Sequence, residues 1–494
     1  MAAQPEFGDM GLSILGLGTQ YPPYDLKPSS LEVLSKRFYP ESPAMNKVLS
    51  INRYTGIDQR SSIGTADHPL VNRPDPPTIA ELNETFMRDG VPLAISAARK
   101  ALAEAHVEPA QVTHMVSTTC TNSANPGYDH FVAKELGLQP STEKVLLHGV
   151  GCSGGLAALR TAANLCLGHT MRRKPARILV VALELSTPLV RSELESINAS
   201  QETRIGVALF SDCASACLLS NSLPFPDSGP SGGPLPPPSP GIYSLIGWQH
   251  RTIPNTEHDL GFDVDPLGWK VVLSPRVPQL TQSVLLPTFT SLLASLPPPF
   301  SPSPSPPSSS SGYGQQQEQK ETAATEPKPA DFDWAMHPGG ATILTGAEQA
   351  LGITPVHMRA SYDTYINHGN SSSATIFSVL DRLRHKDMDA LAPSAGGVKE
   401  HVVGCAFGPG ITVEMCMLRR RMDPRASARG METPPETESE GDVATDVDEV
   451  SEGGEERRCP TTSGTTAGTA AQRSGARDDS EAFISEELER VELD

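Results

Sequence analysis

One stretch, Val145 to Arg160 with the sequence VLLHGVGCSGGLAALR, constrains the fold and chemistry of this chain more than any other. An apolar run leads into a turn of small residues, and a helix-forming segment follows the turn. This order of strand, turn and helix places one side chain at a helix N-terminus, where backbone N–H groups and the helix dipole favour an anion. Cys152 holds that position, so we expect its nucleophilic thiolate form to be stabilised there.

Two other interpretations of this stretch compete with a catalytic cysteine. A cysteine in an apolar setting is usually a small buried hydrophobic residue without chemistry of its own. The turn also reads Gly-Cys-Ser-Gly-Gly over residues 151–155. This matches the G-x-S-x-G nucleophile elbow of α/β-hydrolases and would make Ser153 the nucleophile. The rest of the chain has to decide between them.

Apolar runs typical of buried strands alternate with amphipathic helical segments along much of the chain, which predicts a layered α/β fold. A second set of strand, small-residue turn and helix units, over residues 337–351 and 361–384, suggests an internal duplication. Strands are expected at Gly11–Gly16, His114–Thr119 and Ala176–Leu185, helices at Ser30–Phe38 and Pro92–Ala105, and a short helix followed by a strand at Gly206–Leu219.

Three segments do not fit this pattern. The chain has 46 prolines among 494 residues, and only 38% of its residues are hydrophobic. These values indicate a core of ordinary composition together with Pro-rich or polar segments that lie outside it. Two Pro-rich insertions, residues 221–240 and 296–330, and an acidic tail, residues 421–494, are predicted to be disordered. The remainder predicts one folded half over residues 10–220 and another over residues 241–295 and 331–420.

Charge and cysteine usage exclude several function classes. The net charge of −19 argues against a general nucleic-acid-binding protein. No apolar stretch is long enough to span a membrane, and the first residues do not resemble a secretory signal. The eight cysteines lack metal-ligand spacing, so no metal site is predicted, and free thiols favour a cytoplasmic, reducing location.

Two further stretches combine small residues with chemically capable ones. WAMHPGGATIL places His337 before a glycine-rich turn, and YINHGNSSSATIFSVL places Asn370 before a serine-rich helix start. Taken singly, His337 could be a structural histidine and Asn370 an ordinary helix cap. Together with Cys152 they supply a nucleophile, a base and a neutral donor. A thiolate–imidazolium pair can attack a thioester, and His and Asn donors can stabilise the enolate left when a malonyl thioester loses CO2.

These stretches resemble type III polyketide synthases, the chalcone and stilbene synthase family. GVGCSGGLAALR is similar to the family's nucleophile motif, WAMHPGGATIL to its histidine motif and NHGNSSSATIF to its asparagine motif. ALFSD at residues 208–212 and GCAFGPGITVEMCMLRR at residues 404–420 match two more. The matches follow family order over residues 10–420, apart from the two insertions. The resemblance implies a thiolase-like, duplicated αβαβα fold, and it disfavours Ser153 as nucleophile.

The resemblance also implies roles. Cys152 would carry the starter acyl group and the growing chain. His337 and Asn370 would activate the thiolate, promote decarboxylation of malonyl-CoA and hold the enolate. The enzyme would be an acyltransferase that takes acyl-CoA and malonyl-CoA directly, forms a homodimer, and needs no cofactor beyond its CoA thioester substrates.

Further residues match positions that bind CoA or line the cavity in the family. Lys47 and, less closely, Arg53 fall near a CoA-phosphate contact, and Gly339 and Gly340 would line the pantetheine tunnel. Phe210 matches a gatekeeper aromatic residue. The other candidate cavity residues are Val271, in place of a second gatekeeper phenylalanine, Ser186 and Leu189, in place of threonines, and Ser372.

The cavity positions also suggest a class of product. A less aromatic, more apolar wall should accept a long aliphatic chain better than a flat aromatic one. This pattern is similar to that of fungal enzymes that make alkylpyrones, alkylresorcinols or resorcylic acids from fatty acyl-CoA. Two alternatives share the fold: a ketoacyl carrier-protein synthase primed by acetyl-CoA, and a non-catalytic dimeric lipid-binding protein. The HPGG and GPG sequences favour the polyketide synthase.

Overall fold

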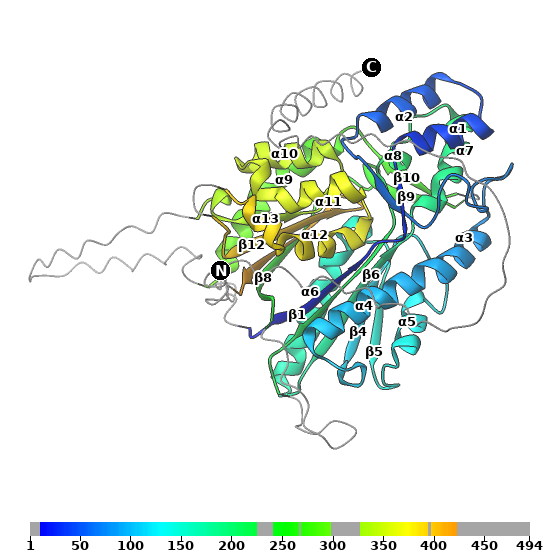
Figure 1. Ribbon diagram of the computed structural model, residues 1–494. Helices are drawn as coiled ribbons and strands as arrows, with labels where there is room; N and C mark the ends of the chain where they lie inside the picture. Colours follow the sequence, from blue (N-terminus) through cyan, green and yellow to red (C-terminus); the bar gives the residue numbers. More distant parts are fainter. Residues whose placement is uncertain (1–9, 225–240, 266–267, 298–326, 394–396, 422–494) are drawn as a thin grey trace, which may run out of the picture. The chain divides into compact units, whose positions relative to one another are not determined.

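The computed structural model describes residues 10–224, 241–265, 268–297, 327–393 and 397–421 (Figure 1). Most of the two predicted insertions and of the acidic tail lies outside the described residues, so their predicted disorder stays a prediction. Among the helices that are described, none combines the length and the apolar character needed to cross a membrane.

A sheet of nine strands runs through the described part of the chain. Its order is β11 (Asp333–Met336), β12 (His401–Gly408), β13 (Thr412–Arg420), β8 (Tyr243–Thr252), β1 (Ser13–Gln20), β7 (Cys213–Ser220), β6 (Arg177–Glu184), β4 (His114–Thr118) and β5 (Glu143–Leu147). Only two residue pairs join β1 to β8, Ser13 with Ser244 and Ile14 with Tyr243. The sheet therefore consists of two half-sheets that meet at one narrow contact, in keeping with the predicted duplication.

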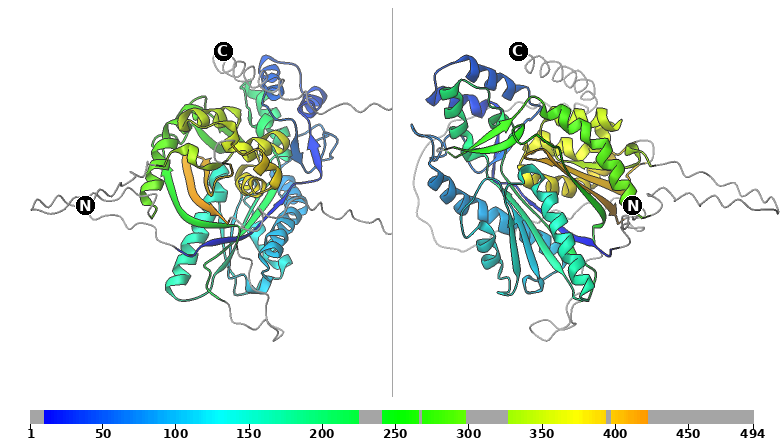
Figure 2. Two further views of the ribbon diagram at one scale, coloured as in Figure 1. Left: turned by 60° about the vertical axis from the view of Figure 1, so that its left-hand side comes forward. Right: turned by 180° about the vertical axis from the view of Figure 1, so that it is seen from behind.

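Helices cover both faces of each half-sheet (Figure 2). Between the half-sheets lie α6 (Gly154–Met171) and α12 (Thr375–Leu383), whose apolar side chains share one core with strands of both halves. On the outer face of the first half-sheet lie α4 (Val91–Ala105) and α5 (Tyr128–Leu136). On the outer face of the second lie α9 (Val277–Ser295) and α10 (Ala341–Leu351). The five alternating layers confirm the predicted αβαβα arrangement.

Smaller elements surround these layers. They comprise the helices α1 (Ser29–Phe38), α2 (Pro43–Arg53), α3 (Ile79–Thr85), α7 (Val190–Ser200), α8 (Gly206–Leu209), α11 (Arg359–His368) and α13 (Lys386–Ala390), and the paired strands β2 (Tyr24–Leu26) with β3 (Arg60–Ser62) and β9 (Leu260–Asp265) with β10 (Gly268–Leu273). Several of them build the wall of the hollow described below.

The expected boundaries differ from the observed ones at a few places. Strand β1 begins at Ser13 rather than Gly11 and extends to Gln20. Asn221 and Leu296, assigned from composition to the Pro-rich insertions, are buried in the folded part. The Asn221 amide oxygen accepts a hydrogen bond from the Ala176 N–H at 2.9 Å. Composition over a window cannot detect such single core residues at the edge of a low-complexity segment.

Two glycines at the start of α6 allow the close packing that brings the two halves together. A Cβ atom at Gly154 would lie 2.5 Å from the Thr118 hydroxyl oxygen at the end of β4. A Cβ atom at Gly155 would lie 2.6 Å from the Ser373 carbonyl oxygen and would also collide with Ile376 of α12. Only residues without a side chain fit here, so the N-terminus of α6 contacts the turn that begins α12.

We predict that Gly155→Ala destabilises the protein by about 1–3 kcal/mol, because the added methyl group overpacks this contact. Gly168 on the same helix is a matched control, because no heavy atom lies within 4 Å of the position its Cβ would take. Gly168→Ala should stabilise by up to about 1 kcal/mol through higher helix propensity. Urea unfolding followed by circular dichroism measures both changes. Equal midpoints for the two variants would contradict the packing argument.

Candidate active site

Cys152 lies in a short helical turn, Gly151–Ser153, directly before α6, as the sequence predicts. Gly151 has a positive φ of 48°, and a Cβ atom there would lie 2.6 Å from a ring carbon of Pro409. Gly408 similarly leaves no room for a side chain beside Ser153. The GPG loop between β12 and β13 therefore packs against the cysteine turn and fixes its position.

Ser153 is occupied by a structural role. Its hydroxyl donates to the Val150 carbonyl oxygen at 2.8 Å, and the residue is only 1% exposed. A serine nucleophile needs a free hydroxyl next to a base. The geometry therefore disfavours the hydrolase interpretation.

Asn370 connects the cysteine side of the site with the histidine side. Its side-chain N–H group donates to the Gly339 carbonyl oxygen at 3.2 Å, and its side-chain oxygen accepts from the Ser372 N–H at 2.8 Å. Its backbone N–H donates to Leu209 and its carbonyl accepts from Ser211, on the two sides of Phe210. The asparagine loop is thus fixed both to the HPGG turn and to the predicted gatekeeper.

Ser372 completes the connection to Cys152. Its hydroxyl donates to the Cys152 sulfur at 3.4 Å and lies 3.3 Å from the Cys120 sulfur. Through Ser372 and Asn370, the turns that carry Cys152 and His337 meet at one place, although the sequence separates them widely. The predicted cavity residue Ser372 therefore lies beside the predicted nucleophile, Cys152.

His337 follows β11, and its backbone N–H donates to the Cys405 carbonyl oxygen at 2.8 Å. The side chain is 1% exposed, and neither ring nitrogen has a hydrogen-bond partner among the described residues. Buried polar atoms without partners are costly, by about 1–3 kcal/mol each, and are therefore rare. Such a ring is available for a proton or for a substrate oxygen.

Burial opposes charge on both groups. It raises the pKa of the Cys152 thiol to about 11, although the Ser372 hydrogen bond acts in the opposite direction. It lowers the pKa of His337 to about 3. Each group is therefore neutral at about pH 7. The thiolate–imidazolium pair expected from the sequence therefore requires that the thiol proton pass from Cys152 to His337, which leaves the sum of their charges unchanged.

Sequence reasoning missed Glu184, a fully buried carboxylate at the end of β6. It accepts hydrogen bonds from the Cys120 N–H, from the Thr121 hydroxyl at 2.8 Å and from the Ser373 hydroxyl at 2.5 Å. Glu184 thus ties the loop after β4 to the turn that contains Ser372. The available signal was one acidic residue at the end of an apolar strand, since carboxylates are rarely buried without partners.

An open apolar hollow adjoins the site at Phe210. Four of the predicted cavity residues line it: Phe210, Val271, Ser186 and Leu189. Sequence reasoning missed Phe262, which pairs with Val271 across β9 and β10 and whose ring centre is 6.2 Å from that of Phe210. An aromatic partner for Phe210 is therefore present on the neighbouring strand, although Val271 is itself aliphatic.

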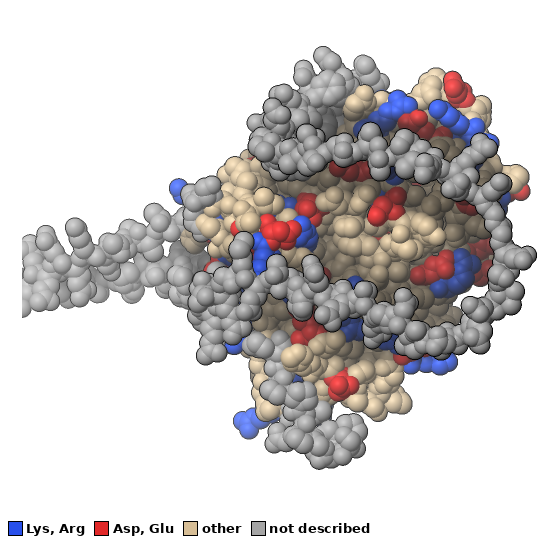
Figure 3. Space-filling view, in the orientation of Figure 1, with Lys and Arg blue, Asp and Glu red and all other residues tan. Residues whose placement is uncertain are grey.

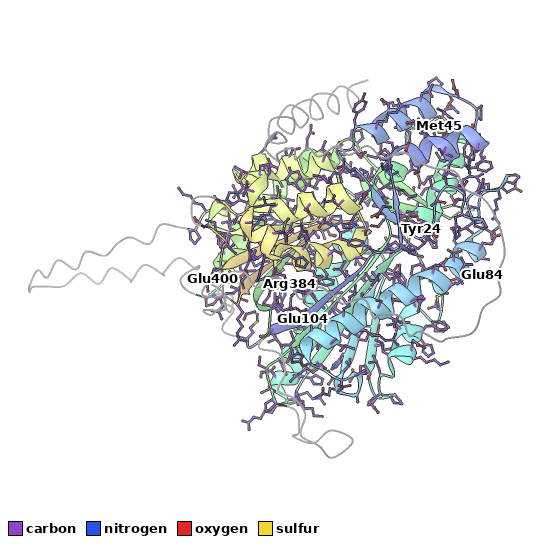
Figure 4. The ribbon with its side chains drawn as sticks, in the orientation of Figure 1. Tyr24, Met45, Glu84, Glu104, Arg384 and Glu400 are labelled. Carbon is purple, nitrogen blue, oxygen red and sulfur yellow. The ribbon has the colours of Figure 1, made fainter. Side chains whose placement is uncertain are left out.

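The predicted CoA-contacting residues differ in how available they are. Lys47 lies on α2, the helix marked by Met45 in Figure 4, is half-buried and forms no ion pair with a described residue. Helix α2 packs on α8, which leads to Phe210. Arg53, by contrast, pairs with Glu32 at 2.7 Å, so its charge is already neutralised.

The two glycines assigned to the tunnel also differ. Gly339 accepts the hydrogen bond from Asn370, and a Cβ atom at Gly340 would meet no heavy atom within 4 Å. Gly340 therefore faces open space beside the site. Among the described residues, no three or more His, Cys, Asp or Glu side chains are grouped so that they could hold a metal ion.

Models of the N-terminal and C-terminal domains of chalcone and stilbene synthases match residues 47–222 and 319–421. The chain is 43% identical over 414 residues to the type III polyketide synthase PspB of Penicillium soppii, covering 83% of this chain and 96% of that protein. It is 35% identical to the acylalkylpyrone synthase CsyB of Aspergillus oryzae, over 83% of this chain and 94% of that one.

Solved structures give the same result. The crystal structure of a type III pentaketide synthase from Neurospora crassa aligns with a TM-score of 0.74 and 68% identity, covering 83% of this chain and all of that one. The structure of CsyB in complex with CoA-SH aligns with a TM-score of 0.72 and 34% identity, with the same coverage.

Proposed function

Since this chain belongs to the chalcone and stilbene synthase family and is a type III polyketide synthase, an acyltransferase of decarboxylative condensation, we propose that its starter is a medium- or long-chain fatty acyl-CoA. The acyl group is loaded on Cys152, extended with units from malonyl-CoA, and cyclised to a pyrone or resorcinol-type product. The observation that carries this proposal is the apolar hollow next to Phe210.

The composition of the hollow supports an aliphatic starter. Its lining is largely aliphatic, with Leu26, Leu31, Leu34, Leu70, Val71, Leu189, Val190, Val207 and Val271 beside the aromatic residues Phe210 and Phe262. Each methylene group removed from water contributes about 0.8 kcal/mol, so a longer chain gains affinity until the hollow is full. One relative, CsyB, is an acylalkylpyrone synthase, which supports the same class of product.

In the proposed loading step, the Cys152 thiol proton passes to the neutral ring of His337 as the sulfur attacks the starter's thioester carbonyl. The carbon–sulfur bond to CoA then breaks, and the departing CoA thiolate takes the proton back from the ring. The free ring nitrogens of His337 support this role, because no hydrogen bond to a described residue has to break first.

In the proposed extension step, the bond between the malonyl α-carbon and its carboxylate breaks, and CO2 leaves. The electron pair remains as an enolate, whose oxygen accepts hydrogen bonds from His337 and Asn370. The Asn370 amide has a second N–H besides the one that contacts Gly339, which supports its role as a donor. The α-carbon then attacks the acyl carbonyl on Cys152 and releases the thiolate for the next cycle.

We also propose a homodimer and a cytoplasmic location. The edge strand β5 supports the dimer, because its residues are exposed or half-buried. Val145 of β5 and Phe131 of α5 are each 39% exposed. An edge strand with exposed apolar residues favours pairing with another chain. The seven cysteines of the described residues are free thiols, which is typical of a reducing compartment.

Incubation of the purified enzyme with malonyl-CoA and starters from acetyl-CoA through stearoyl-CoA to coumaroyl-CoA tests the proposal. We expect pyrones or resorcinols from long aliphatic starters, identified by mass spectrometry. Products only from coumaroyl-CoA, or only with an acyl carrier protein present, would refute the proposed starter class. Light scattering on the same preparation should give the mass of a dimer, and the mass of one chain would refute that part.

A further inference from the structure

The segment of residues 63–74, which we call the outer wall, borders the hollow on one side. On its other side lies an open, polar groove bordered by Tyr24 and by Glu84 of α3, both labelled in Figure 4. Charged side chains gather near α3 on this side in Figure 3, and Glu81, Glu84, Arg88 and Asp89 border the groove. Five residues of the outer wall line both the hollow and the groove: Ile63, Gly64, Thr65, His68 and Leu70.

A buried cation holds the end of the outer wall. Arg191 of α7 is 0% exposed, and its guanidinium donates to the carbonyl oxygens of Val71 at 2.5 Å, Arg73 at 2.6 Å and Pro74 at 2.9 Å. The group lies 3.9 Å above the centre of the Phe38 ring, and no carboxylate pairs with it among the described residues. A fourth hydrogen bond runs from Arg191 to the Tyr39 hydroxyl at 3.1 Å. Burying a charge without a counter-ion costs several kcal/mol, so these hydrogen bonds are its main compensation.

A buried carboxylate holds the beginning of the outer wall. Asp212 accepts from the Ile63 N–H at 2.9 Å, and also from the Ser186 N–H at 2.7 Å and the Thr187 N–H at 2.8 Å. Residues 186–190 form the opposite, inner side of the hollow. Arg191 directly follows this inner side in the chain. The two charged residues thus fix the inner and the outer side relative to each other.

Between these anchors the outer wall makes few bonds to the rest of the protein. Most of its hydrogen bonds are local, such as those from the N–H groups of His68 to Thr65 and of Val71 to His68. The contacts to other elements come from charged groups: Arg37 of α1 donates to the Ala66 carbonyl oxygen at 3.1 Å and pairs with Asp67 at 2.6 Å, and Arg73 pairs with Glu81 of α3. Contacts of exposed charged groups hold weakly, so the anchors carry most of the positioning.

We propose that the outer wall determines which acyl chain lengths the enzyme accepts, and that Arg191 is a positioning residue that sets the distance of this wall from Leu189. The inference rests on the proposed function, because it assigns the hollow to the acyl chain. A chain that fills the hollow meets Leu70 and its neighbours. A longer chain has to push the wall aside, and its end then enters the groove.

Steady-state kinetics with octanoyl-CoA and stearoyl-CoA test the proposal in the full-length enzyme. In Leu70→Ala and in Arg191→Met, we expect the ratio of kcat/KM for stearoyl over octanoyl to rise about tenfold, the gain from about two further buried methylenes. Arg191→Lys should restore most of the wild-type ratio. Arg99→Met is the matched control: Arg99 of α4 pairs with Glu135 and borders neither the hollow nor the groove, so the ratio should stay unchanged.

Each outcome supports or overturns the proposal. A parallel fall of kcat/KM for both starters, or an unchanged ratio in Leu70→Ala, would mean that the wall is only structural. If Arg191→Met does not fold, Leu70→Ala decides alone, because Leu70 is half-buried and makes no anchoring bond through its side chain. A wild-type enzyme that gives no product from any aliphatic starter refutes the proposed function, and this inference with it. If the wild-type enzyme is active with aliphatic starters but the variants keep its stearoyl-to-octanoyl ratio, this inference is refuted and the proposed function stands.

Discussion

Replacement of Cys152 by alanine is expected to abolish polyketide formation from every starter while leaving slow release of CO2 from malonyl-CoA. Loss of a covalent nucleophile lowers turnover by at least about 10⁴-fold, because the acyl group has no other attachment point. Decarboxylation, in contrast, depends on the donors that hold the enolate. His337 and Asn370 are held by the Cys405 and Gly339 carbonyl oxygens rather than by the thiol, so their positions survive the substitution.

Cys120→Ala is the matched control for this prediction. The Cys120 sulfur lies 3.3 Å from the same Ser372 hydroxyl that contacts Cys152 at 3.4 Å, so the two variants remove neighbouring thiols. The control should still form product. Mass spectrometry of products and release of labelled CO2 from malonyl-CoA separate the two activities. Product from Cys152→Ala, or loss of product only in Cys120→Ala, would show that Cys152 is not the nucleophile.

The sequence alone predicts those features of the fold and the site that depend on neighbouring residues. The order of strand, small-residue turn and helix around Cys152 is a property of neighbouring residues, and the structure has the same order from β5 to α6. The helix Ser30–Phe38 and the strand His114–Thr119 were likewise predicted to within one residue. The five layers could be predicted from the alternation of elements and from the family resemblance.

The sequence alone does not predict the role of a residue whose partners are far away in the chain. Glu184 and Asp212 are single acidic residues next to apolar strands, and their importance comes from hydrogen bonds to chain segments far away in sequence. Phe262 became relevant only through strand pairing with Val271, because register decides which side chains share a face. The neutral charge states of Cys152 and His337 depend on burial, which no motif specifies.

Replacement of His337 by glutamine is expected to slow alkylation of Cys152 by iodoacetamide at about pH 7 by at least about 100-fold, because thiolate formation loses its proton acceptor. Glutamine retains an N–H donor of similar reach but cannot accept the thiol proton. Burial raises the pKa of the Cys152 thiol to about 11, and the variant has no ring nitrogen of residue 337 to take up the thiol proton. The thiolate fraction, and with it the rate, should therefore rise about tenfold per pH unit up to that pKa and fall equally on acidification.

In the wild-type enzyme the same rate should depend less steeply on pH near neutrality. Burial lowers the pKa of His337 to about 3, so the ring remains able to accept a proton down to acidic pH. Mass spectrometry of the Cys152 peptide after timed labelling measures both profiles. His368→Gln is the matched control. His368 lies two residues before Asn370, and its ring centre is 3.6 Å from that of Tyr21, on which it stacks. Loss of this ring should leave the labelling rate unchanged. If His337→Gln is labelled as fast as the wild type at neutral pH, His337 is not the base, and the proton of Cys152 leaves by a route that does not use the two unpartnered ring nitrogens of His337.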